Sequence, residues 1–127
     1  MDIFFLDPSE VPLPPEEVKI RQFRAEPRPD GVRVRIYLEV DPFQKKPSAE
    51  ITIRDPEGNE AASVSIIESV TRRMELTMHL RTQPQAGVYT AHAVLVYSEV
   101  TPDAKDQSPL QNVTQVDQAE TEFSLPG

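Results

Sequence analysis

The sequence predicts an all-β protein, a sandwich of seven short strands, and three observations carry this prediction. Apolar residues recur at every second position in several runs, as in strands with one face on a core and the other in water. Turn residues separate these runs at intervals of roughly 8–12 residues, which is typical of β-sandwiches. The 13 prolines of the 127-residue chain fall mostly between the runs, where an all-β protein tolerates them.

The first three strands are expected at 18–24, 32–41 and 48–54. The second of these alternates most clearly between apolar and polar residues. Turns at 26–31 and 41–47 separate the strands, because proline fixes φ there and ends regular pairing. The residues expected to face the core are Val18, Ile20, Val32, Val34, Ile36, Leu38, Val40, Ala49, Ile51 and Ile53.

The other four strands are expected at 60–67, 72–82, 88–99 and 120–126. A helix over 72–82 is rejected, because helical spacing would place its apolar and polar residues on the same face. The residues expected to face the core are Ala62, Val64, Ile66, Met74, Leu76, Met78, Leu80, Tyr89, Ala91, Ala93, Leu95, Tyr97, Thr121, Phe123 and Leu125.

Two segments stand outside this pattern. Residues 1–17 form a proline-rich N-terminal arm ahead of the domain at 18–127, and residues 101–118 form a long polar loop within that domain. The arm carries an apolar patch, Ile3, Phe4, Phe5 and Leu6, which is unusual for a free tail. We expect this patch to pack on its own domain, on a second copy of the chain or on another protein.

The segment before the sixth strand resembles the tyrosine corner of immunoglobulin-like domains, usually Asp-x-Gly-x-Tyr-x-Cys. Gly87 and Tyr89 match this pattern, while Gln85 replaces the aspartate and Ala91 replaces the cysteine. The resemblance is to immunoglobulin-like or fibronectin type III-like sandwiches in the broad sense. It implies that Tyr89 reaches back to a backbone group at the corner before its strand.

The same resemblance implies a Greek-key order of the strands, labelled A, B, C, C′, E, F and G in chain order. The two antiparallel sheets would then be A-B-E and G-F-C-C′, packed face to face. Strand 32–41 has no cysteine and strand 48–54 has no tryptophan, so the antibody-type core is absent. The resemblance carries no function, because this architecture hosts many unrelated roles.

Composition narrows the classes of partner. A net charge of −8 and a pI near 4.7 weigh against nucleic acid and against anionic membranes. The chain has no cysteine, and only 6% of its residues are aromatic, which leaves few rings for stacking on sugars or bases. No signal peptide or membrane-length apolar run is visible, so we expect a cytoplasmic location.

Few residues suggest a catalytic or metal-binding role. His79 and His92 are expected on the outer faces of different sheets, which argues against a shared metal site. Acidic residues around Gly58, at 55–60, do not have the spacing of an EF-hand calcium loop, and we interpret them as an exposed turn. The glycosylation sequon at 112–114 is interpreted as part of a loop. We expect no cofactor, no metal and no catalytic residue.

Two outer faces remain as candidates for contacts. Arg33, Arg35 and Tyr37 should lie opposite Glu75, Thr77 and His79 on the neighbouring strand, where cross-strand pairing explains them without a ligand.

Val94 and Val96 point outward from the central strand of the G-F-C-C′ sheet, and we expect another segment or a partner to cover these apolar side chains. With Ile3–Leu6 they form the predicted interaction surface of a non-catalytic protein-interaction or structural module. Its partner would be another protein or a second copy of the chain. The alternative is an accessory domain that binds a peptide strand or a carbohydrate, through loops at one end (42–47, 68–71 and 101–118) or through a sheet edge.

Overall fold

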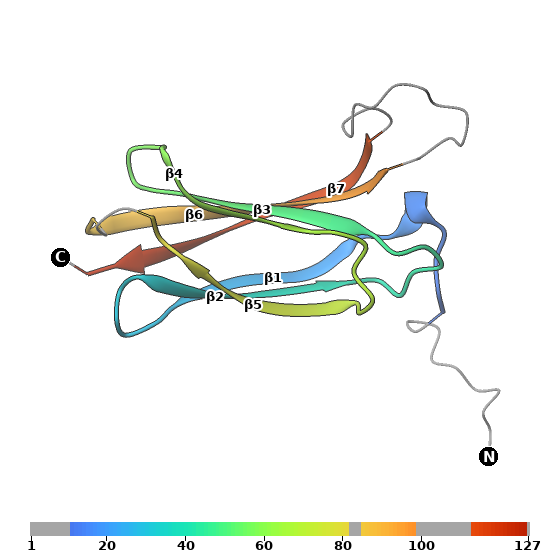
Figure 1. Cartoon of the computed structure of the whole chain (residues 1–127), viewed down its shortest axis with the longest axis horizontal. Helices are drawn as coiled ribbons and strands as arrows, with labels where there is room; N and C mark the ends of the chain where they lie inside the picture. Colours follow the sequence, from blue (N-terminus) through green and yellow to red (C-terminus); the bar gives the residue numbers. More distant parts are fainter. Residues whose placement is uncertain (1–10, 82–84, 99–112, 127) are drawn as a thin grey trace, which may run out of the picture.

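The computed structural model describes residues 11–81, 85–98 and 113–126, which form two antiparallel sheets packed face to face (Figure 1). The described residues contain one short 3₁₀ helix, η2 (Pro15–Glu17), and seven strands. The strands are β1 (Ile20–Pro27), β2 (Arg33–Val40), β3 (Ser48–Arg54), β4 (Glu60–Ile66), β5 (Arg73–His79), β6 (Gly87–Ser98) and β7 (Val113–Leu125).

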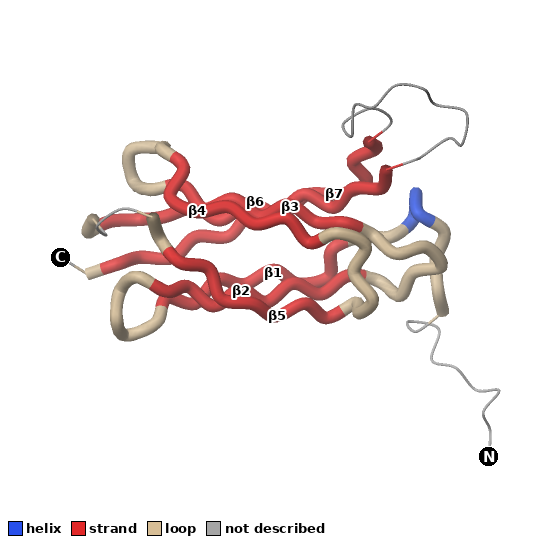
Figure 2. The backbone as a smooth tube through the Cα atoms, viewed as in Figure 1, coloured by secondary structure: helices blue, strands red, loops and turns tan. Residues whose placement is uncertain are grey.

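The strand order confirms the predicted sandwich. One sheet has the order β1-β2-β5 and the other has the order β4-β3-β6-β7, and every neighbouring pair is antiparallel. These are the expected sheets A-B-E and G-F-C-C′. The tube in Figure 2 shows the two layers edge-on, with the connecting loops gathered at the two ends of the sandwich.

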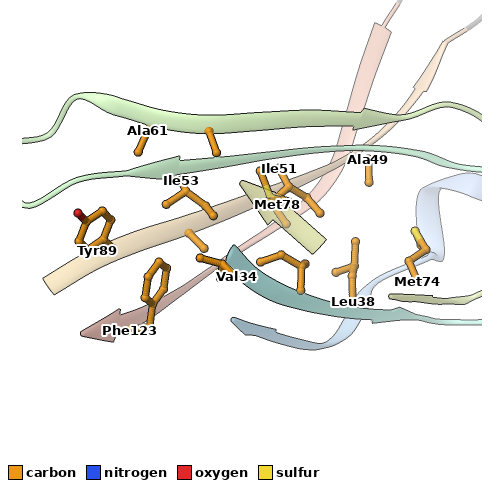
Figure 3. Packing of buried hydrophobic residues seen from close by; sticks show 14 of the residues in the cluster. Val34, Leu38, Ala49, Ile51, Ile53, Ala61, Met74, Met78, Tyr89 and Phe123 are labelled. Carbon is orange, nitrogen blue, oxygen red and sulfur yellow. The ribbon is translucent and has the colours of Figure 1, made fainter. Parts of the chain in front are cut away.

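The core lies between the sheets and is built from the alternating apolar residues of the facing strands. Val34 and Leu38 of β2 are buried, as are Ile51 and Ile53 of β3. Figure 3 shows these four side chains meeting between the layers, with Tyr89 of β6 at one side. The alternation in the sequence therefore places the core correctly, because each apolar set occupies one face of its strand.

The first strand differs from the prediction at both ends. β1 begins at Ile20 and continues to Pro27, where Glu26 and Pro27 were expected to form a turn. Val18 is fully buried, yet it precedes the strand. A register shift between Ile20 and Gln22 interrupts the pairing with β2. Proline is tolerated as the last residue of β1, because β1 is an edge strand.

Two apolar residues lie outside the strands that were predicted to contain them, and Val32 was also expected to face the core. Val32 is 37% exposed, because it belongs to the turn in which Asp30 accepts its backbone N–H. Ile67, predicted as the end of a strand, is 72% exposed and lies beyond β4. The strand expected over 72–82 is likewise shorter, since β5 ends at His79.

The last strand is the largest correction. β7 begins at Val113, so residues 113–118 belong to a strand and not to the expected polar loop. The pairing passes from Leu95–Asp117 to Val96–Gln115, which leaves Val116 as an extra residue in β7. A bulge of this kind interrupts the alternation of apolar and polar residues. Because strands are predicted from that alternation, the first part of β7 does not stand out in the sequence.

The described half of the N-terminal arm packs on its own domain. The Leu13 N–H donates to the carbonyl of Pro42 (3.0 Å), and the Gln44 N–H donates to the carbonyl of Leu13 (2.9 Å). Leu13 thereby forms an isolated parallel bridge with Phe43. The arm is thus anchored on the β2–β3 loop before it enters β1.

Polar contacts join the two sheets at both open edges. The Ile20 N–H of β1 donates to Asp117 Oδ2 of β7 (2.8 Å), and Lys19 Nζ donates to the carbonyl of Val116 (3.1 Å). At the other edge, the Arg81 N–H donates to the carbonyl of Ala61 in β4 (2.8 Å). These contacts cover parts of edge strands that would otherwise expose backbone groups.

Candidate functional site

Strand β6 is the element around which the candidate site is built, because it runs through the middle of the four-stranded sheet. It begins at Gly87, whose φ of +136° disfavours other residues. A Cβ at Gly87 would lie 2.8 Å from Cγ of Pro56, in the β3–β4 turn. Glycine therefore lets that turn pack closely on the start of β6.

Tyr89 fixes the corner before β6. Its hydroxyl accepts the N–H of Gln85 (2.8 Å) and donates to the carbonyl of Gln85 (3.1 Å), so it reaches back to the backbone as the resemblance implies. The ring is buried and stacks on Phe123 of β7, with 5.3 Å between centroids. Ala91, at the position of the missing cysteine, is fully buried against the facing sheet.

The outer face of β6 carries the predicted contact residues. Val94 lies between Glu50 of β3 and Gln118 of β7, and Val96 lies between Ser48 and Gln115. Both valines point outward, opposite to the buried Ala93 and Leu95, and both are half-buried. The longer side chains of Glu50, Gln115 and Gln118 on the neighbouring strands flank them, which is consistent with this partial cover.

The centre of this face is built from short, mostly β-branched side chains, while charged and amide side chains lie along its margins. The half-buried central residues are Thr52, Thr90, His92, Val94 and Val96. Such side chains lose little rotamer freedom when a partner covers them.

The outer face of the other sheet is chemically different. Arg35 Nε donates to Glu75 Oε1 (3.1 Å), Arg24 pairs with Glu26 (3.0 Å), and the Arg24 guanidinium lies 4.4 Å from the centre of the Tyr37 ring. The ion pair with Glu75 raises the pKa of Arg35 above its ordinary value.

The register also places Arg33, Arg35 and Tyr37 opposite His79, Thr77 and Glu75, as predicted. The charges of this face are therefore largely paired with one another.

Two aspartates that could suggest ligands serve turns instead. Asp30 accepts the N–H groups of Val32 and Arg33 (3.0 Å each), and these bonds, with the Arg33 side chain, lower its pKa to about 2. Asp55 accepts the N–H groups of Glu57 and Asn59 (2.9 Å each). Asp55 thus closes its own turn, in agreement with the interpretation of residues 55–60 as an exposed turn.

The histidines lie apart. His79 is on β5 and His92 is on β6, in different sheets. His92 Nε2 lies 2.9 Å from Gln118 Oε1 in a shallow hollow that Glu120 also lines. Within the described ranges, no group of three or more His, Cys, Asp or Glu side chains could hold a metal ion.

Several crossing loops meet at one end of the sandwich, where Figure 1 shows η2, the β2–β3 loop and the β4–β5 loop together. Tyr97 donates to the carbonyl of Lys45 there (2.8 Å), and burial raises the pKa of Tyr97 to about 12. A hollow of about 120 Å³ beside this contact is lined by Pro15, Lys45, Tyr97 and Val116, among others.

Part of the predicted site cannot be compared with the structure. Ile3, Phe4, Phe5 and Leu6 lie outside the described residues, as do 101–112 of the predicted loop. Asn112 of the sequon lies outside them too, whereas Val113 and Thr114 lie in β7 and not in a loop. Among the described residues, no helix is long and apolar enough to cross a membrane.

Comparison with known proteins supports the fold and little more. No protein-family model and no curated protein sequence matches the chain. Its structure resembles a portion of β-glucuronidase from Bifidobacterium dentium, solved with coumarin-3-O-glucuronide. The TM-score is 0.51 and the identity is 17%, over 85% of this chain and 18% of the enzyme.

A second similar structure is a glycosyl hydrolase family 2 member from Bacteroides cellulosilyticus. The TM-score is 0.50 and the identity is 10%, over 84% of this chain and 15% of that one. The chain therefore spans less than a fifth of each enzyme, and the likeness shows a shared β-sandwich.

Proposed function

We propose that this chain is a non-catalytic protein-interaction or structural module, and that it contacts a partner protein through the outer face of β6 around Val94 and Val96. The observation that carries the proposal is the difference between the two outer faces. A partner that docked on β1-β2-β5 would have to desolvate charge pairs such as Arg35–Glu75. A partner on β6 would cover half-buried valines and threonines, whose burial is favourable.

Two further observations support a non-catalytic role. Polar groups that could act in chemistry are engaged in the fold itself, as with Asp55 in its turn and Tyr89 at its corner. The chain also resembles a β-sandwich portion of glycosyl hydrolase family 2 enzymes, so the same architecture occurs as one part of larger proteins.

The test is capture of a partner from native extract by the immobilised chain, followed by affinity measurement with that purified partner. Val94→Arg should weaken binding at least tenfold, because a long cation would have to be buried in the contact. Thr77→Arg is the matched control, since Thr77 is exposed on the outer face of the other sheet and its replacement should leave affinity unchanged. Equal binding by both variants would exclude the β6 face.

The second candidate function is an accessory domain that binds a carbohydrate or a peptide strand. The likeness to a portion of a β-glucuronidase favours the carbohydrate version, while the low aromatic content weighs against it. A glycan array separates the two candidates: specific binding to one glycan class would support the accessory domain, and an array without binding would remove its carbohydrate version.

A further inference from the structure

Strand β4 is one edge of the four-stranded sheet, and it lacks the protection that the other three sheet edges have. Edge strands present unpaired backbone N–H and C=O groups, and proteins commonly protect them with charged residues or proline. The protecting residues of the other edges are Arg24, Glu26 and Pro27 in β1, Arg73 and Glu75 in β5, and Glu120 and Glu122 in β7. After Glu60, by contrast, β4 continues as Ala-Ala-Ser-Val-Ser-Ile, with no charge, proline or glycine.

One hydrogen bond shows which backbone groups of β4 point to its open side. The Arg81 N–H donates to the carbonyl of Ala61 (2.8 Å), on the side of β4 that β3 does not occupy. Alternate residues of an antiparallel strand point their N–H and C=O groups to the same side, so those of Ser63 and Ser65 point to this open side as well. Arg81 also donates to Ser63 Oγ (2.9 Å), a bond that uses the side chain of Ser63 and not its backbone. Among the described residues, β3 is the only strand that pairs with β4.

The core side of β4 is also incompletely covered. Val64 and Ile66 pack against the core but are only half-buried, whereas Ile51 and Ile53 on the neighbouring β3 are fully buried. A further strand beside β4 would continue the inner layer of the sheet and cover the exposed parts of Val64 and Ile66. Burial of this apolar surface would favour the contact in addition to the backbone hydrogen bonds.

The segment is suited to pairing with a second copy of itself. In a two-fold antiparallel pair with Val64 opposite Val64 of the other copy, Ser63 lies opposite Ser65 and Ala62 lies opposite Ile66. The outward backbone groups of Ser63 and Ser65 then meet as a hydrogen-bonded pair, and the two valines occupy the closer, non-hydrogen-bonded position. A small residue faces a large one in the Ala62–Ile66 pair, so the side chains of the two strands can pack side by side.

The distribution of charge fits the same pairing. Each copy carries a net charge of −8, so a stable contact between two copies needs a surface that places no like charges opposite each other. Residues 62–66 meet this requirement. Beyond them, the register brings Glu68 of one copy toward Glu60 of the other, where the Arg81 guanidinium already lies 2.9 Å from Glu60 Oε2 and supplies positive charge.

We propose that two copies of this chain pair antiparallel through β4, centred on Val64, and join their four-stranded sheets into one continuous sheet. The contact uses the edge of the sheet and not the outer face of β6, so it is independent of the function proposed above.

A single introduced cysteine tests this pairing in the full chain, which has no cysteine of its own. Residues opposite each other at a non-hydrogen-bonded position have Cα atoms about 4.5 Å apart, a separation that a disulfide can span. Val64→Cys should therefore form a disulfide-linked dimer on mild oxidation. Ser65→Cys is the matched control, because it is more exposed but would lie opposite residue 63, so that two such cysteines are too far apart to bond. Random collision predicts the reverse, with the more exposed cysteine forming the dimer faster.

Light scattering on the unmodified chain is the second measurement, and we expect the mass to rise from one chain to two as the concentration increases. Ser65→Pro should abolish this rise, because proline removes the N–H that points to the other copy and is tolerated on an edge strand. Ser65→Lys is a second variant that keeps the backbone intact, and it should weaken the dimer by placing a cation near Arg81 of the other copy. Circular dichroism verifies that both variants fold.

Three results would overturn the proposal. The first is a chain that stays monomeric at every concentration, and the second is a dimer that persists in both Ser65 variants, which would assign the contact to another surface. The third is a Ser65→Cys variant that forms the disulfide as readily as Val64→Cys, which would exclude pairing centred on Val64.

Discussion

The hydroxyl of Tyr89 offers the sharpest test of how the sandwich is held at its corner. Tyr89→Phe keeps the ring stacked on Phe123 and removes only the oxygen that accepts from the N–H of Gln85 and donates to its carbonyl. Two such bonds contribute about 1 kcal/mol each, so we expect a loss of about 2 kcal/mol in the free energy of unfolding.

The corresponding change in melting temperature follows from the size of the chain. With an unfolding entropy of about 2.1 cal/mol/K per residue, a loss of about 2 kcal/mol lowers the Tm by about 7 °C in a chain of 127 residues. Calorimetry or thermal circular dichroism measures this shift, and urea denaturation measures the free energy independently.

Tyr97→Phe is the internal control for this measurement. Its hydroxyl makes one bond, to the carbonyl of the exposed Lys45, so its loss should be about 1 kcal/mol or less. If Tyr89→Phe destabilises the protein no more than Tyr97→Phe does, the hydroxyl of Tyr89 does not hold the corner and the reasoning is refuted.

Two other predictions concern backbone and charge. Gly87→Ala should lower the free energy of unfolding by about 1–3 kcal/mol, because the new Cβ would meet Pro56 and the residue has a positive φ. Gly58→Ala is the control: its φ is also positive, but nothing lies within 4 Å of the new Cβ, so it should be destabilised less. Urea denaturation compares the two variants. Asp30 has an ordinary pKa of 3.8 and a folded value of about 2, so its contribution to stability is present above pH 3.8 and is lost as the pH falls toward 2. In Asp30→Asn, a stability profile measured between pH 5 and pH 2 should therefore fall less steeply than in the wild type, and parallel profiles would contradict this assignment.

Much of the fold could be predicted because a strand with one buried face and one exposed face has alternating apolar and polar residues. The run from Val34 to Val40 is an example, since every second residue is buried and the strand pairs with β5 as expected. Gly87 and Tyr89 then identified the sixth strand, because the tyrosine-corner motif precedes that strand in immunoglobulin-like sandwiches.

The misplaced start of β7 shows where this reasoning fails. Val116 is an extra residue in the ladder, so the polar residues before it fall out of phase with those after it. The anchoring of Leu13 on Phe43 is equally invisible to periodicity, because it is a single bridge between distant residues. Local patterns encode which face a side chain takes, but not where a bulge or an isolated bridge occurs.

The candidate site was predictable only in part for the same reason. Val94 and Val96 were recognised because they break the polar side of an alternating strand. The exposure of Ile67 was not recognised, since an isoleucine that ends an apolar run looks like the last residue of a strand.

The most direct test of the proposed function is to map the captured partner on the isotope-labelled chain by amide chemical shifts. We predict that the partner shifts or broadens the signals of β3, β6 and β7 around Val94 and Val96, and leaves those of β1, β2 and β5 in place. Shifts confined to the β1-β2-β5 sheet, or to the loops at one end, would contradict the assignment of the β6 face as the contact surface.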